Sequence, residues 1–210
     1  MTDIYINLAD LFEYPSLDWD SKINVGSDNH SLTEFRSAIN TLSLSDLQEL
    51  YTRTFDLNPV CALEIGYHLF GENYKRGQFL ASLRETEAPF DLSQEHQLPD
   101  YLPALLRLLT KLEDEELRGS LIGECLVPAI GKMLASLKDT ENPYRYLLEC
   151  VRTTLQSEAG CVSIEAPRLN VRASLPVLTN DLLNSSGPYE VSRMREFAAP
   201  SDLNTNRDLF

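Results

Sequence analysis

Apolar side chains recur every three to four residues along most of the chain, the spacing that places them on one face of an α-helix. In the first such segment Ile4, Leu8, Leu11 and Phe12 share a face, and Pro15 ends the segment. Strict alternation of apolar and polar residues, which is typical of a half-buried strand, does not extend over useful lengths. The spacing therefore predicts an all-α protein, with helices at about 4–12, 31–42, 43–55, 59–71, 74–86, 100–112, 115–137 and 143–155.

Capping signals indicate where several of these helices begin. Ser31 with Glu34 has the sequence of a capping box, and Asp100 can cap the helix that follows it. Asn58–Pro59 and Asn142–Pro143 each join an N-cap residue to a proline at the first helical position. These signals predict sharp helix starts at the four places.

Other residues set the remaining helix ends. Ser43 or Ser45 can cap the helix that carries Leu47 to Phe55, and Gly71 is a favourable C-terminal residue. Pro128 falls inside the long segment 115–137 and predicts a kink there. The connections are short, as expected between neighbouring helices of a bundle.

The composition changes near Ser157, where Pro, Ser and Asn become frequent and apolar residues lose their period. We therefore expect a single-domain helical bundle at residues 1–156 and a largely irregular C-terminal tail at residues 157–210, flexible or partly ordered. Within the tail, 181–183 and 192–197 are candidate helical turns.

The net charge of the chain indicates which classes of binding partner are favoured. The 210 residues include 32 acidic and 18 basic side chains, a net charge of −14, and residues 1–156 carry −12 of it (25 acids against 13 bases). Binding to nucleic acid or to an anionic membrane depends on Lys and Arg, so this balance disfavours both. It favours a partner that is itself basic.

Neither a membrane span nor a secretory signal is expected. The longest stretch without a charge, Ser37–Ser45, has nine residues, against about 20 apolar residues for a span. Asp3 lies where a signal peptide would be basic, and no apolar segment follows it. These features predict a cytoplasmic protein.

Catalytic signatures are missing from the sequence. It contains no Gly-x-Ser-x-Gly, no phosphate-binding glycine loop and no His-Glu-x-x-His, so its motifs indicate no catalytic mechanism and no cofactor. One alternative stays open, a small metal-binding enzyme in which Glu64, His68 and Glu72, spaced four apart, share a helix face. A surface or salt-bridged histidine at a helix end is the commoner arrangement.

The cysteines do not indicate a metal or disulfide framework. They are irregularly spaced and include no Cys-x-x-Cys, which favours small buried apolar residues. The four are Cys61, Cys125, Cys150 and Cys161.

Aromatic and acidic residues concentrate in two segments, 49–56 and 66–71, on either side of Asn58–Pro59. The aromatic ones are Tyr51, Phe55, Tyr67 and Phe70, and the acids in and beside the segments are Glu49, Asp56, Glu64 and Glu72. Such a set suits a groove for a basic amphipathic helix, with aromatic rings for its apolar face and carboxylates for its Lys or Arg. Ordinary core packing beneath a solvated acidic face is the alternative.

Four motifs resemble one family. They are Leu8-Ala-Asp-Leu-Phe-Glu-Tyr-Pro15, Glu49-Leu-Tyr-x-x-Thr-Phe-Asp56, Tyr67-His-Leu-Phe-Gly-Glu72 followed by Arg76-Gly77, and Leu98-Pro-Asp-Tyr-Leu-Pro103. In this order and spacing the chain resembles the TorD/DmsD/NarJ superfamily of molybdenum-enzyme assembly chaperones, and within it the NarJ-type nitrate reductase branch. The resemblance covers about residues 4–155.

The resemblance implies an all-helical chaperone that is not an enzyme. It implies binding to the apo catalytic subunit of a respiratory nitrate reductase, including its N-terminal leader-like peptide, until molybdenum cofactor has been inserted. Molybdenum cofactor biosynthesis proteins are a further implied partner class, and a different molybdenum oxidoreductase is an alternative client. By motif match we expect the client-peptide-binding residues to be Tyr51, Phe55, Asp56, Tyr67, His68, Asp100 and Tyr101.

Overall fold

The computed structural model describes residues 2–19, 29–57, 61–90, 92, 97–138 and 141–162, with only the backbone described at 2, 3 and 160–162. The helices are α1 (Thr2–Asp10), α3 (His30–Ile39), α4 (Leu44–Tyr51), η1 (Thr52–Asp56), α5 (Ile65–Phe70), α6 (Tyr74–Glu87), η3 (Ala88–Phe90), α7 (Leu102–Leu109), α8 (Glu115–Ser120), η4 (Leu121–Leu126), α9 (Val127–Ser136) and α10 (Tyr144–Val162). Here η1 and η4 are π-helical and η3 is a 3₁₀ turn. The all-α prediction is confirmed for these residues.

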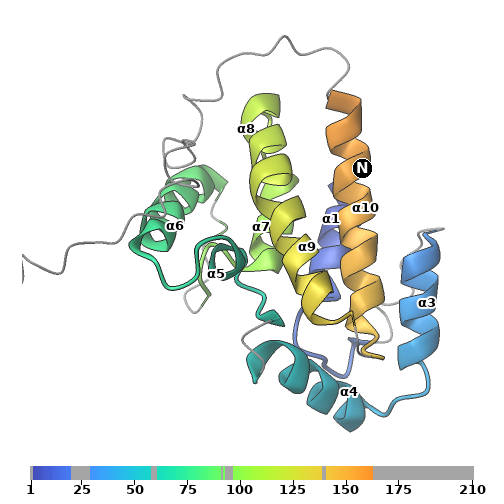
Figure 1. Ribbon diagram of the computed structural model, residues 1–210. Coiled ribbons are helices and arrows are strands. Elements are labelled where there is room, and N and C mark those ends of the chain that lie inside the picture. Colours follow the sequence, from blue (N-terminus) through green and yellow to red (C-terminus); the bar gives the residue numbers. More distant parts are fainter. Residues whose placement is uncertain are drawn as a thin grey trace, which may run out of the picture.

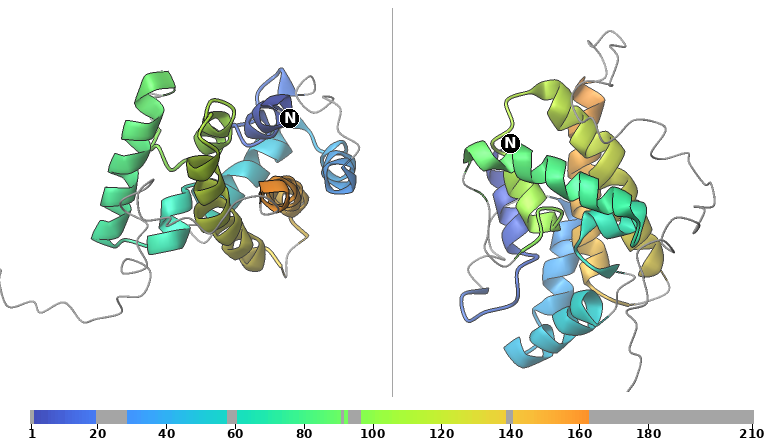
Figure 2. Two further views of the ribbon diagram at one scale, coloured as in Figure 1. Left: turned by 90° about the horizontal axis from the view of Figure 1, so that it is seen from above. Right: turned by 90° about the vertical axis from the view of Figure 1, so that its left-hand side faces the viewer.

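The helix α10 lies at the centre of the bundle. The α8–η4–α9 segment runs beside α10 on one side and α3 lies on the other, while α4 crosses beneath (Figure 1). Viewed from above, α6 and α3 lie at opposite edges of the molecule (Figure 2). Because α1 packs on α7, and α5 packs on both α6 and α9, segments distant in sequence are brought together.

Aromatic side chains join α4, η1, α3 and α10. The ring of Phe55 lies 4.7 Å from that of Tyr144 and 5.1 Å from that of Tyr51, centre to centre, and Phe35 lies 5.5 Å from Tyr144. All four side chains are buried. Contacts of this geometry add to the burial of apolar area, so this cluster holds the end of η1 against the start of α10.

Helix starts agree with the sequence prediction at two places and differ at two, the first of which is the start of α3. Ser43 and Asp46 form the capping box of α4, and the Asn142 side chain accepts a hydrogen bond from the Tyr144 backbone at 3.0 Å. The predicted box of Ser31 with Glu34 is wrong. Asn29 caps α3 instead, accepting from the backbone of Ser31 at 2.9 Å.

The helix predicted at 59–71 is shorter than expected. It begins at Ile65, and the proposed start at Asn58–Pro59 lies outside the described residues. Backbone hydrogen bonds join Ile65 to Asp100 (2.8 Å) and Leu102 to Leu63 (2.9 Å), so residues 63–65 pair with a distant segment. The C-terminal prediction is confirmed, since Gly71 ends α5 with φ 62°.

Asp100 does not cap α7. The N-cap position belongs to Tyr101, whose side chain makes no capping bond. The Asp100 carboxylate instead accepts from the Gly66 backbone and from Arg76, which lie on α5 and α6. Its local sequence resembles a helix cap, but its partners come from elsewhere in the fold.

The segment predicted at 115–137 is one continuous helical stretch. Its irregularity is the π-helical η4, where the Val127 amide bonds to the carbonyl of Ile122, five residues earlier. Pro128 lies in the first turn of α9, where a missing amide hydrogen is tolerated. The change of winding therefore lies before Pro128 rather than at it.

The helix α10 runs to Val162, past the composition change at Ser157. Glu158, in this extension, accepts hydrogen bonds from Tyr5 and Arg118 and so belongs to the packed helices. The predicted turns at 181–183 and 192–197 lie outside the described residues. No helix in the ranges given above is both long and apolar enough to cross a bilayer.

The burial expected of the cysteines is confirmed for the three whose side chains are described. These are Cys61, Cys125 and Cys150, each with a free thiol.

Candidate functional site

The candidate site begins with an isolated antiparallel bridge between Glu64 and Tyr101. It joins the loop before α5 to the loop before α7. The loop before α7 carries residues of the motif at 98–103, and the bridge places Tyr101 beside η1. Two segments separated by more than 30 residues thus form one wall.

Beside this bridge is a pocket of about 500 Å³. Its walls come from the end of α1, from α4 and η1, and from the two bridged loops. The lining residues are Glu13, Tyr14, Tyr51, Phe55, Asp56, Leu63, Glu64, Gln97, Leu98 and Tyr101. We call it the acid–aromatic pocket, since it combines three carboxylates with four aromatic rings.

Two tyrosines fix its floor. The Tyr51 hydroxyl donates to the carbonyl of Phe12 at 2.9 Å, and the Tyr101 hydroxyl lies 3.3 Å from Tyr51 Oη and 3.4 Å from the same carbonyl. Burial raises the pKa of Tyr101 to about 12 and raises the pKa of Tyr51 further. Both rings therefore stay neutral and act as fixed donors at physiological pH.

The three carboxylates differ in what neutralises them. Glu13 accepts from Arg107 at 2.8 Å, and the same guanidinium bonds to Asp10 at 2.8 Å. Asp56 and Glu64 have no Lys or Arg nitrogen within 4 Å among the residues that the structure describes. The pocket therefore presents two uncompensated negative charges to an incoming ligand.

The rim of the pocket exposes large apolar side chains. Tyr14 is 51% exposed, Leu98 is 40% exposed, and Leu57, directly after Asp56, is 76% exposed. Contiguous apolar surface rimmed by charge is typical of a protein interaction site. The combination suits a ligand that has both an apolar face and positive charges.

Asp100, a predicted site residue, has no exposed surface. It accepts from the Gly66 backbone at 3.1 Å and from Arg76 Nε at 3.0 Å. A Cβ at Gly66 would lie 2.6 Å from the Asp100 carboxylate, so only glycine fits there. Asp100 thus joins the loop before α7 to α5 and α6 and does not line the pocket.

Tyr67 and His68 lie on α5 outside the pocket lining. His68 Nε2 donates to the carbonyl of Ala62 at 2.7 Å, and Lys132 donates to the His68 carbonyl at 2.6 Å. Burial lowers the pKa of His68, which keeps the ring neutral. Of the seven predicted residues, the structure brings together Tyr51, Phe55, Asp56 and Tyr101.

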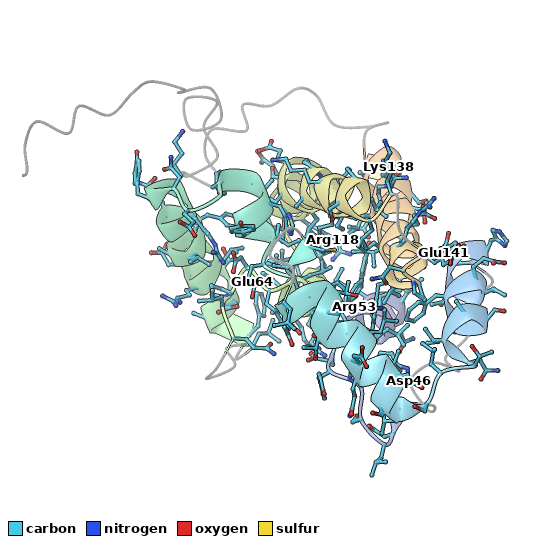
Figure 3. The ribbon with its side chains drawn as sticks, turned by 60° about the horizontal axis from the view of Figure 1, so that its bottom comes forward. Asp46, Arg53, Glu64, Arg118, Lys138 and Glu141 are labelled. Atoms are coloured by element: carbon cyan, nitrogen blue, oxygen red, sulfur yellow. The ribbon has the colours of Figure 1, made fainter. Side chains whose placement is uncertain are left out.

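The acids expected to share one groove are divided among different places. Asp56 and Glu64 line the acid–aromatic pocket, whereas Glu49 lines a separate cavity of about 720 Å³ with Arg53. Figure 3 shows Arg53 on η1 and Glu64 beyond the end of that helix. Glu72 is exposed just after α5 and lines neither cavity.

The alternative metal site finds no support in this geometry. No three His, Cys, Asp or Glu side chains within the described ranges are close enough together to hold a metal ion. Glu64, His68 and Glu72 are all described. His68 Nε2 is protonated and donates a hydrogen bond to the Ala62 carbonyl.

Sequence reasoning missed several lining residues. Glu13 and Tyr14 belong to the motif at 8–15, and Leu98 to the motif at 98–103, so the motifs contain the signal. Their place in the pocket depends on the packing of α1 against α7, which periodicity does not reveal.

Comparisons with known proteins agree with this arrangement of motifs. Residues 24–139 match the family model described as nitrate reductase delta subunit. A probable nitrate reductase molybdenum cofactor assembly chaperone from Escherichia coli K12, NarW, is 28% identical over 147 residues, 67% of this chain and 63% of that protein. The protein of the same description from Bacillus subtilis 168, NarJ, is 26% identical over 169 residues, 75% of this chain and 91% of that protein.

The chain thus spans less than two thirds of the first of these relatives and most of the second. The family match covers more than half of the chain and includes three of the four motifs. This chain belongs to the nitrate reductase delta subunit family.

Proposed function

We propose that the protein is a cytoplasmic assembly chaperone for a nitrate reductase. Its two relatives are described as probable nitrate reductase molybdenum cofactor assembly chaperones. It binds the apo catalytic subunit, including an N-terminal leader-like peptide, while molybdenum cofactor is inserted. It is not an enzyme and holds no cofactor of its own.

One observation carries the proposal. Residues from three separate motifs line the acid–aromatic pocket, namely Glu13 and Tyr14, then Tyr51, Phe55 and Asp56, then Leu98 and Tyr101. A basic amphipathic peptide would place apolar side chains on the rings and a Lys or Arg beside Asp56 and Glu64. Charge-assisted hydrogen bonds of this kind are about twice as strong as neutral ones.

The direct test is calorimetry of the full chain with a synthetic peptide from the N-terminus of the nitrate reductase catalytic subunit. We expect a Kd in the micromolar range or tighter. Absence of both heat and NMR chemical-shift change, with folded protein, would refute leader binding. Leader peptides of other molybdenum oxidoreductases, tested alongside, identify the preferred client.

Charge reversal locates the binding site. Asp56→Lys and Glu64→Lys should each weaken binding about tenfold, since each replaces an attraction by a repulsion inside the pocket. Glu49→Lys is the matched control, because Glu49 is equally acidic but lines the neighbouring cavity. Equal binding by Asp56→Lys, Glu64→Lys and the unmodified chain would leave chaperone function possible but show that this pocket is not the peptide site.

A further inference from the structure

A second cleft, more apolar than the first, lies along the C-terminal half of α10. Its volume is about 600 Å³, and it shares no lining residue with the acid–aromatic pocket. We call it the α10 cleft. Its walls include Ile4, Tyr5, Gly119, Ile122, Thr154 and Ala159, from α1, α8, η4 and α10. Two of the helices that line it, α8 and α10, reach the upper end of the bundle in Figure 1.

Glu158, Arg118 and the two threonines of this cleft already have partners. Glu158 accepts from the Tyr5 hydroxyl at 2.5 Å and from Arg118 Nη2 at 3.0 Å, and Arg118 Nε bonds to its other oxygen. The Thr153 and Thr154 hydroxyls donate to carbonyls within α10. With these donors engaged, the walls offer mainly aliphatic surface. The cleft therefore selects an aliphatic ligand rather than a charged one.

We propose that this cleft is the docking site of the chain's own segment 169–183. The segment is rich in aliphatic residues, with Leu169, Val171, Leu175, Val177, Leu178, Leu182 and Leu183 among its 15 positions. It also brings Arg172 toward a rim that carries Glu115. Its chemistry thus matches the cleft in both apolar character and charge.

The segment 169–183 is close enough along the chain to reach the α10 cleft. The last turns of α10 form one wall, and the chain continues directly from Val162. Along α10 the cleft extends from Thr153 to Ala159, about 9 Å at the helical rise. Residues 163–168 can span about 20 Å when extended, so the segment can reach the whole cleft.

Tethering also favours this segment over a second copy of the chain. A short linker gives an effective concentration on the order of 1 mM. A segment that binds with a Kd of about 10 µM is then docked about 100 times more often than undocked. Free protein at micromolar concentration would leave the same cleft mostly empty.

Trypsin digestion of the full chain tests the proposal. Arg172 lies in the docking segment and Arg207 lies well beyond it, so cleavage after Arg207 is the internal reference. We expect cleavage after Arg172 to be at least ten times slower than after Arg207. Gly119→Leu fills the cleft and should bring the two rates to within about twofold.

The matched control is Gly123→Leu, a change of the same kind that lies outside the cleft lining. Added side-chain atoms meet nothing within 4 Å at Cβ of either glycine, so both variants should fold. Gly123→Leu should keep the protection of Arg172. If Gly119→Leu does not fold, the double substitution Val177→Asp with Leu178→Asp takes its place in the digestion test. It removes the docking residues and leaves the cleft intact.

Two results would overturn the proposal. Equal cleavage after Arg172 and Arg207 in the unmodified chain would show that the segment is not docked. Protection that increases with protein concentration would assign the cleft to a second copy. Neither result bears on leader binding, which is measured separately at the acid–aromatic pocket.

Discussion

Gly66 is the residue at which the packing of the two bridged loops leaves least room. Its missing side chain allows the Asp100 carboxylate to accept from the Gly66 backbone and from Arg76 at the same time. A methyl group here would lie 2.6 Å from Asp100 Oδ2. The position is therefore constrained by close approach.

We expect Gly66→Ala to lower the free energy of unfolding by about 3 kcal/mol, because it combines overpacking with a disturbed buried hydrogen bond. Urea denaturation followed by circular dichroism measures the change. Gly77→Ala is the control, since a Cβ there meets nothing within 4 Å and the site lies inside α6. It should stabilise by about 0.5–1 kcal/mol, and a similar loss in both variants would contradict the close-approach account.

The ionisation of Glu158 makes the free energy of unfolding depend on pH. Burial alone would raise the pKa of this carboxyl, but hydrogen bonds from Arg118 and Tyr5 and the guanidinium charge together lower it. Because the folded-state pKa is lower than the unfolded one, the contribution is complete above about pH 4.5. It is lost as the pH falls through the folded-state pKa.

Glu158→Gln should therefore cost about 2 kcal/mol near pH 7, and the difference from the unmodified chain should shrink below about pH 4.5. Denaturation curves at several pH values measure this difference, and contributions of other carboxyls cancel in it. Glu149→Gln, on the same helix with the exposed partner Arg145, should cost about 0.5 kcal/mol or less. A pH-independent difference for Glu158→Gln would refute the ionic assignment.

Among the elements, the π-helical η1 is held by hydrogen bonds of Thr54 in addition to the aromatic contacts of Phe55. Thr54, in η1, donates to the Leu50 carbonyl at 2.6 Å and accepts from Asn142 Nδ2 at 2.6 Å. Asn142 also caps α10. The element that carries Phe55 and Asp56 is thus joined directly to the start of the central helix.

Thr54→Val should destabilise the protein by about 1–3 kcal/mol, since it removes a buried hydroxyl and leaves the partly buried Asn142 amide without its acceptor. Thr153→Val removes a hydroxyl that bonds only within its own helix and should change stability by less than about 0.5 kcal/mol. Guanidinium denaturation of both variants makes the comparison. Equal effects would show that the contact between η1 and Asn142 contributes little.

The elements also show what sequence could and could not predict. Apolar spacing located the helices, because it reflects the faces that become buried, but it placed the start of α5 too early. The capping predictions at Ser31 and Asp100 were wrong. At both places the local pattern competes with hydrogen-bond partners that come together only in the folded protein. The pocket is also formed by segments that are distant in sequence. Four of its residues, Tyr51, Phe55, Asp56 and Tyr101, were predicted from the motifs, whereas Glu13 was not.

For the molecule as a whole, the net charge of −14 acts at long range. It raises the frequency of encounters with a basic peptide before any contact forms. Salt screens this attraction, while contacts inside a closed pocket are screened less.

We therefore expect the association rate of a basic leader peptide to fall about tenfold or more between 50 mM and 500 mM NaCl, with a smaller change in the dissociation rate. Stopped-flow fluorescence with a labelled peptide measures both rates. A peptide of the same length with its Lys and Arg replaced by Gln is the control. An association rate that does not change with salt would show that the overall charge does not guide binding.

The shared hydrogen bonds at the Phe12 carbonyl have a consequence for biosynthesis. This one oxygen is approached by hydroxyls from Tyr51 and Tyr101, so three stretches of the chain meet at a single backbone atom. A chain still emerging from the ribosome cannot form this junction before Tyr101 has been made. The acid–aromatic pocket, where we propose that the leader peptide binds, is therefore complete only after that point in translation.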